Sequence, residues 1–101
     1  MKKHSLAAVL CLALSASAYG AQDPDLARNL AATCSNCHGT NGKAVPGAGI
    51  DPLAGEPQEK LMKKLREFRA GTRAATIMHQ IAKGYSDEQL ELVTAWFAAQ
   101  K

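Results

Sequence analysis

The chain has 101 residues, with 12 Lys plus Arg, 9 Asp plus Glu and a formal net charge of +3. Hydrophobic residues make up 47% and charged residues 21%, which argues against a disordered chain, and the length limits the protein to one small domain. A domain of this size usually needs a disulfide, a metal or a cofactor to reach ordinary stability. We therefore expect its core to contain such a group.

The N-terminal segment has the pattern of a secretory signal peptide. Two lysines precede an apolar stretch over residues 6–14, and small residues follow it. We prefer cleavage before Ala21, with a cut before Tyr19 as the alternative. A membrane anchor is less favoured, because the apolar stretch is shorter than the roughly 20 residues of a membrane span. We expect residues 1–20 to be removed and residues 21–101 to form the exported domain.

Removal of the signal peptide changes the charge and the cysteine count. It leaves 10 basic and 9 acidic residues, a net charge of about +1. Nucleic-acid binding loses its support, because it needs a concentrated cationic surface. Cys11 leaves with the peptide, so two cysteines remain in an oxidising compartment, where they could form a disulfide.

The two remaining cysteines belong to a motif, because residues 34–38 read CSNCH, the Cys-x-x-Cys-His attachment sequence for c-type haem. On a helical turn this spacing puts the thiols of Cys34 and Cys37 on one side, where they can add across two haem vinyl groups. His38 can then present its imidazole to the iron. A thioredoxin-like redox pair, a zinc site that includes His79 and a plain disulfide are the alternatives. The adjacent histidine favours haem.

The first predicted helix begins with Asp23 as N-cap and Pro24 as first residue, and it carries the two cysteines at its end. Residues 39–55 contain five Gly and two Pro, which predicts a loop wrapped over the haem edge. Ile50 and Leu53 in this loop are candidates for porphyrin contacts or for ordinary anchors on the core.

Three further helices follow. One is predicted over residues 57–70 and stopped by Gly71, with basic residues on its outer faces, and a short one over residues 74–83. The last helix opens with a capping box at residues 86–89. No strand pattern is present. The fold class is therefore all-α, with about four helices around one cofactor.

The second axial ligand of the iron has three candidates. Met62 lies between leucines in a regular helix, which favours a role as core filler. Met78 lies beyond that helix, where the chain can return over the opposite haem face. His79 would give a lower potential, because a thioether favours reduced iron more than an imidazole does. The spacing favours Met78, with His79 as the alternative and core packing as a further role for Met78.

Four segments resemble the small periplasmic class I cytochromes c of bacteria: CSNCHGTNG at 34–42, PLAG at 52–55, KLREFRAG at 64–71 and SDEQLELVTAWF at 86–97. The resemblance spans almost the whole exported part. Residues 76–86 are also similar to the cytochrome subunit of flavocytochrome c sulfide dehydrogenase.

The resemblance implies a cytochrome c fold, in which the first and last helices cross and Cys34 and Cys37 hold one covalent haem. His38 and Met78 match the axial ligands of the family. Members often have a proline after the haem histidine whose carbonyl accepts the imidazole N–H. Pro46 is the candidate here, although valine precedes it where the family has glycine.

The function expected from motif and resemblance is periplasmic electron transfer rather than catalysis. The first hypothesis is the electron-accepting subunit of a sulfide-oxidising flavocytochrome c, whose partner is a flavoprotein. The second is a free cytochrome c that carries electrons to a terminal oxidase or a reaction centre. A haem enzyme or gas sensor with an open sixth coordination position is the third. We expect no nucleic-acid partner and no membrane span in the exported part.

Overall fold

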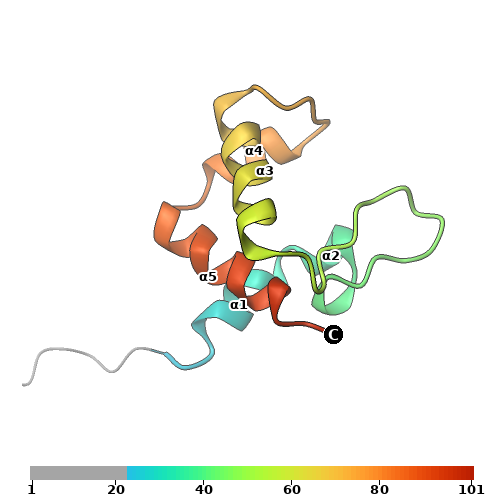
Figure 1. Cartoon of the computed structure of the whole chain (residues 1–101), viewed down its shortest axis with the longest axis vertical. Helices are drawn as coiled ribbons and strands as arrows, with labels where there is room; N and C mark the ends of the chain where they lie inside the picture. The colour runs from blue at the N-terminus through green and yellow to red at the C-terminus, as the bar shows by residue number, and fades with distance from the viewer. Residues whose placement is uncertain (1–22) are drawn as a thin grey trace, which may run out of the picture.

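The computed structural model describes residues 23–101, so the predicted signal peptide lies outside the described residues. This range contains five α-helices, one 3₁₀ helix and no strand, which confirms the all-α class (Figure 1). No helix within it has the length and apolar character needed to cross a membrane. The helices are α1 (Leu26–Ala32), α2 (Ser35–His38), α3 (Gln58–Ala70), α4 (Met78–Lys83) and α5 (Asp87–Ala98), and the 3₁₀ helix is η1 (Thr40–Gly42).

The first and last helices pack against each other, as the resemblance implied. α1 contacts α5, and α3 contacts both α4 and α5 (Figure 1). Where these helices meet, a buried cluster forms from Ala31, Leu61, Val93 and Phe97. One apolar core thus joins three helices that lie far apart in the sequence, and the wall of the functional cavity is built on it.

The predicted first helix is divided in two. α1 ends at Ala32, and the amide of Cys34 donates to the carbonyl of Ala31 at 3.0 Å, a bond to residue i−3 that tightens the helical path. Cys34 is therefore the N-cap of α2, which carries Cys37 and His38. The cysteines lie on a separate short helix, which corrects the prediction that they end the first one.

The start of α1 also differs from the prediction. The helix begins at Leu26 rather than at Pro24. The carboxylate of Asp23 accepts the amide of Asp25 at 2.9 Å, so it caps a turn that precedes the helix. Asp23 accepts a backbone hydrogen bond as expected, but the N-cap of α1 is Asp25, two residues later.

The fourth helix begins at Met78, four residues later than predicted. Residues 74–77 form an irregular segment that lines the cavity described below. Thr76 and Ile77 are consecutive β-branched residues, which lose side-chain freedom in a helix, and Ile77 has a non-helical φ of −138°. The chain therefore stays non-helical past the cavity until α4 starts.

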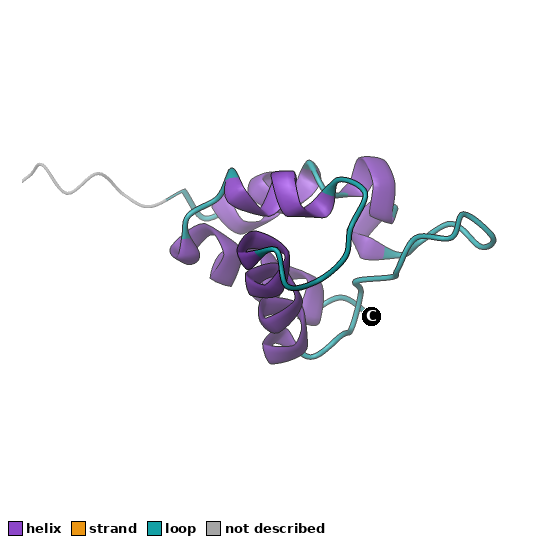
Figure 2. Cartoon of the chain, turned by 90° about the horizontal axis from the view of Figure 1, so that it is seen from above, coloured by secondary structure: helices purple, strands orange, loops and turns teal. Residues whose placement is uncertain are grey.

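The remaining boundaries follow the sequence signals. Gly71 ends α3 in the left-handed conformation, with φ of 77°. Ser86 and Gln89 form the predicted capping box of α5, with reciprocal bonds of 2.9 and 3.1 Å. Between η1 and α3 the chain extends away from the helices as a long loop (Figure 2).

Candidate functional site

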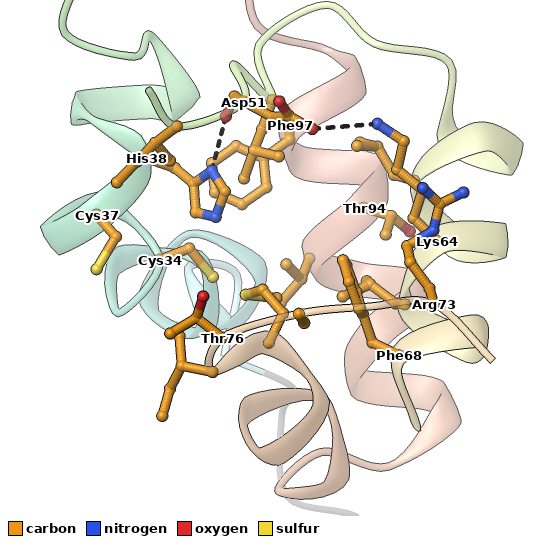
Figure 3. A pocket seen from close by; sticks show the side chains of 18 of the residues that line it. Cys34, Cys37, His38, Asp51, Lys64, Phe68, Arg73, Thr76, Thr94 and Phe97 are labelled. Carbon is orange, nitrogen blue, oxygen red and sulfur yellow. Dashed lines mark hydrogen bonds and ion pairs between the residues drawn. The ribbon is translucent and has the colours of Figure 1, made fainter. Parts of the chain in front are cut away.

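A cavity of about 430 Å³ lies between α2, α3, α5 and two loops (Figure 3). Cofactor and ligand sites usually occupy roughly 300–1,000 Å³. The wall is largely apolar. Its hydrophobic side chains come from the loop after η1, from α3, from α5 and from residues 74–78, and they include Ile50, Leu53, Leu61, Leu65, Phe68, Ile77, Met78, Val93 and Phe97. The loop residues Ile50 and Leu53 thus line the cavity. A flat apolar ligand is the kind of molecule that such a wall accommodates.

The two cysteines of the motif both line this cavity. Cys34 is half-buried and Cys37 is exposed, and both are free thiols in this structure. Burial raises the pKa of the Cys34 thiol above its ordinary value, while a hydrogen bond with Thr33 acts in the opposite direction. The neutral thiol is the form that burial favours.

The competing interpretations of the motif gain no support. Within residues 23–101 no strand accompanies the cysteines, whereas a thioredoxin-like site requires a βαβ setting. The same part of the chain brings no three His, Cys, Asp or Glu side chains together in a group that could hold a metal ion. The disulfide alternative is not realised either, because both thiols are free.

His38 lines the same cavity, and its ring is held by a backbone group. Its Nδ1 atom lies 2.7 Å from the carbonyl oxygen of Asp51 (Figure 3). A carbonyl oxygen only accepts, so Nδ1 carries the proton and donates. In the neutral imidazole Nε2 then keeps its lone pair, which is the state a metal ligand requires.

The acceptor for His38 corrects the expectation from the resemblance. The carbonyl belongs to Asp51, which precedes Pro52, and Pro46 does not provide it. A proline restricts the residue before it to extended conformations, so Pro52 limits the directions in which the Asp51 carbonyl can point. The sequence carries no direct signal for this acceptor, because every residue has a carbonyl group.

The structure separates the three candidates for the second axial position. Met78, at the start of α4, lines the cavity. Met62 is 5% exposed in the hydrophobic core and does not line the cavity, which confirms the core-filler interpretation. His79 is also not among the residues that line the cavity. The thioether of Met78 is thus the side chain that α4 offers to the same cavity as His38.

Two cationic side chains complete the cavity wall, Lys64 from α3 and Arg73 from the segment after it. Arg73 Nε donates to Glu67 Oε2 at 2.7 Å, and its guanidinium lies 5.8 Å from the centre of the Phe68 ring. Hydrogen bonds from Lys63 and then Arg73 hold the pKa of Glu67 below its ordinary value. The sequence analysis places Lys64 among the basic residues on the outer faces of its helix, and it assigns neither Lys64 nor Arg73 to a cavity wall.

The side chains of the cavity match the requirements of a c-type haem. Two thiols at the attachment spacing and an imidazole with a free Nε2 lie beside a thioether, within apolar walls. This is the donor set that covalent haem with histidine and methionine ligation uses. The residues present therefore fit the group.

Comparisons with known proteins give the same result. The sequence model of the family described as "Cytochrome c" matches residues 25–101. Cytochrome c4 of Pseudomonas aeruginosa is 32% identical over 101 residues, covering 100% of this chain and 50% of that protein. The thiosulfate dehydrogenase electron acceptor of Stutzerimonas stutzeri is 35% identical, covering 93% of this chain and 46% of that protein.

A further relative is the cytochrome subunit of sulfide dehydrogenase from Chlorobaculum tepidum. It is 34% identical over 68 residues, covering 67% of this chain and 60% of that protein. This chain spans about half the length of the cytochrome c4 and thiosulfate dehydrogenase electron acceptor that it matches.

Family match, helical fold and cavity chemistry agree. Members of this family hold a covalently bound c-type haem and act as electron carriers or electron-transfer subunits rather than as enzymes. The chain belongs to the cytochrome c family and is a class I c-type cytochrome.

Proposed function

We propose that Cys34 and Cys37 bind the haem covalently and that His38 and Met78 are its axial ligands. The observation that carries the proposal is that all four side chains line one cavity. Each thiol adds across a vinyl double bond: the S–H bond breaks, an S–C bond forms, and the hydrogen goes to the other vinyl carbon. The bound haem supplies reversible one-electron chemistry at its iron.

The chain's own residues determine how that site behaves. His38 would hold the iron through the lone pair of Nε2, and the hydrogen bond to the Asp51 carbonyl orients the ring and increases its basicity. The Met78 thioether favours reduced iron, which raises the potential relative to a second imidazole. The apolar wall limits solvent access, which further tunes the potential.

We propose that residues 1–20 direct export to the periplasm and that residues 21–101 form the cytochrome domain. Support comes from the family match, which begins at residue 25, and from the lysines and apolar stretch of residues 1–20. N-terminal sequencing of the protein purified from cells tests the boundary, with Ala21 expected as the first residue.

The partner that we propose is a flavoprotein that oxidises sulfide and passes its electrons to this chain. The sulfide dehydrogenase subunit among the relatives supports it. A geometric feature agrees: Ile50 and Ile77 line the cavity and are 37% and 54% exposed, so apolar surface borders the proposed haem edge. Exposed apolar side chains of this kind suit a partner interface.

A second candidate is a free carrier of the cytochrome c4 kind, which the similarity to that protein favours.

A partner interface made of the basic residues of α3 has little support, because these residues form ion pairs with carboxylates of the same chain. Lys60 pairs with Glu56, and Arg69 with Asp87. In the described part of the chain, four of the five basic residues of α3 have a carboxylate partner, so the helix offers little unpaired charge to steer an acidic partner.

Two measurements test the proposal. The protein purified from the periplasm should contain one haem that stays attached after denaturation, and it should titrate with one electron per chain. A C34A/C37A variant should contain none. A pull-down from the native periplasm should recover a flavin-containing chain whose reduction by sulfide reduces this cytochrome. A monomer that recovers no flavoprotein would favour the free carrier instead.

A further inference from the structure

We propose that Lys64 and Arg73 bind the two propionate carboxylates of the haem and thereby help to set its reduction potential. The inference rests on the haem attachment proposed above and adds a binding role for two side chains. Both side chains are part of the wall of a largely apolar cavity. Each cation has one carboxylate partner, Asp51 for Lys64 and Glu67 for Arg73, and the geometry of each pair leaves hydrogen-bond donors for a further carboxylate.

The position of the two cations fits the shape of the porphyrin. Figure 3 shows the sulfur atoms of Cys34 and Cys37 on one side of the cavity and Lys64 and Arg73 on the other. In the haem macrocycle the two vinyl groups and the two propionates occupy opposite edges. Attachment of the vinyl edge to the cysteines therefore directs the propionate edge towards Lys64 and Arg73.

The local charges leave room for an added anion. Two cationic side chains, Lys64 and Arg73, line this end of the cavity, and the lining residues include one carboxylate, that of Asp51. Glu67 is shared, because it accepts from both Lys63 and Arg73. This end of the cavity thus carries a surplus of positive charge near a site where propionates would bring negative charge.

Arg73 is arranged to bind a second carboxylate. It donates to Glu67 through Nε, and residues 23–101 provide no hydrogen-bond partner for its two terminal nitrogens. The Phe68 ring, 5.8 Å from the guanidinium carbon, supports the planar group at the cavity wall. The free edge of a guanidinium matches a carboxylate in two parallel hydrogen bonds.

Lys64 is loosely held by its present partner. Its Nζ atom lies 3.5 Å from Asp51 Oδ2, at the limit of hydrogen bonding, and the Asp51 side chain is 77% exposed. A propionate at the cavity can therefore take the ammonium group without breaking a strong pair. Since Asp51 also accepts from His38 through its carbonyl, one residue contacts both the proposed propionate end and the proposed axial ligand.

The test compares holoprotein variants at fixed pH and low ionic strength. K64Q and R73Q each remove one cation, while K64R and R73K keep it. K63Q is the matched control, because Lys63 is the adjacent lysine, pairs with the same Glu67 and does not line the cavity. Haem content comes from the absorption spectrum, the midpoint potential from a redox titration, and the propionate carboxylate bands from redox-induced infrared difference spectra.

We expect K64Q and R73Q to lower the potential, because an uncompensated propionate favours oxidised iron, and to shift the propionate bands. K64R and R73K should keep the potential and the propionate bands close to those of the wild type. K63Q should leave both unchanged. Should R73Q fail to retain haem, the K64Q and K64R pair decides. Haem-loaded variants with unchanged potential and unchanged bands would overturn this assignment alone. A wild-type protein without haem would overturn the proposed function and this assignment with it.

Discussion

The Nδ1 atom of His38 lies 2.7 Å from the backbone carbonyl oxygen of Asp51. This contact joins α2 to the far end of a loop thirteen residues away and determines which ring nitrogen is available to a metal. A second hydrogen bond closes the base of this loop, where the amide of Leu53 donates to the Gly42 carbonyl at 2.8 Å. The orientation of the proposed axial histidine thus depends on a loop that the sequence predicts to be irregular.

Substitution of Pro52 tests that dependence. In P52A the residue before position 52 gains conformational freedom, so the Asp51 carbonyl is held less firmly and the imidazole becomes a weaker donor to oxidised iron. The midpoint potential should rise by tens of mV, on a scale of about 59 mV for each tenfold change in a one-electron equilibrium. P46A is the matched control in the same loop and should leave the potential unchanged. Equal shifts in the two variants would contradict the role of the Asp51 carbonyl.

Substitution of the two methionines should affect two different properties, the midpoint potential for Met78 and the free energy of unfolding for Met62. M78A removes the proposed thioether ligand, so the potential should fall by on the order of 0.1 V or more, within the roughly 0.8 V range that axial ligands span. M62A opens a cavity in the core, so it should lower the free energy of unfolding by about 2–5 kcal/mol with little change in potential. Redox titration and denaturant unfolding of both variants separate the two roles. A potential that depends on Met62 rather than Met78 would be the unexpected result.

Gly42 is predicted to be intolerant of a side chain. It is buried with φ of 77°, and a Cβ there would lie 2.7 Å from a Phe97 ring carbon and 2.9 Å from the Ala54 amide nitrogen. G42A should cost about 3 kcal/mol, from backbone strain and overpacking together. Gly47 has a similar φ of 81° but nothing within 4 Å of its Cβ position, so G47A should cost only about 1 kcal/mol. Thermal unfolding gives both values, and equal losses would show that contact with α5 is unimportant.

Acid should destabilise the protein partly through Asp87. A hydrogen bond from Arg69 lowers the pKa of Asp87, so the folded state binds the proton less readily than the unfolded state. The contribution of this pair is present above the ordinary carboxyl pKa of about 3.9 and is lost as pH falls through the lowered folded value. D87N should therefore flatten the fall in urea midpoint between about pH 5 and pH 3.

The control for that measurement is E88Q, on the same helical turn. The described part of the chain provides no ion pair for Glu88. The E88Q variant should keep the wild-type slope of the urea midpoint against pH. If E88Q and D87N changed this slope equally, the effect would belong to the helix N-terminus rather than to the pair of Asp87 with Arg69.

Much of the fold could be predicted from residues that carry a local signal. The capping box at Ser86 and the glycine after α3 each determine a boundary through their own side chain or lack of one, and both are observed. The breaks at Thr33 and at residues 74–77 were missed, because helical periodicity continues through both segments. At residues 76–77 two β-branched side chains disfavour a helix, and the segment lines the cavity instead.

The site was predictable to the extent that its chemistry resides in side chains. The Cys-x-x-Cys-His spacing predicts the cysteines and His38 as site residues, and the structure brings Met78 to the same cavity. The Asp51 carbonyl could not be found, because a backbone acceptor has no sequence signature. Lys64 is one of several basic residues of α3, and only the three-dimensional arrangement separates it from Lys63. Arg73 follows α3, and no local pattern assigns it to the cavity wall.

X-ray absorption at the iron edge tests the central claim most directly, because it identifies the atoms bound to iron. The wild-type protein should show one sulfur and five nitrogen ligands. The sulfur should disappear in M78A and persist in H79A, M62A and K63Q. An iron without a sulfur ligand in the wild type, or a ligand set that changes in H79A and not in M78A, would contradict coordination by His38 and Met78.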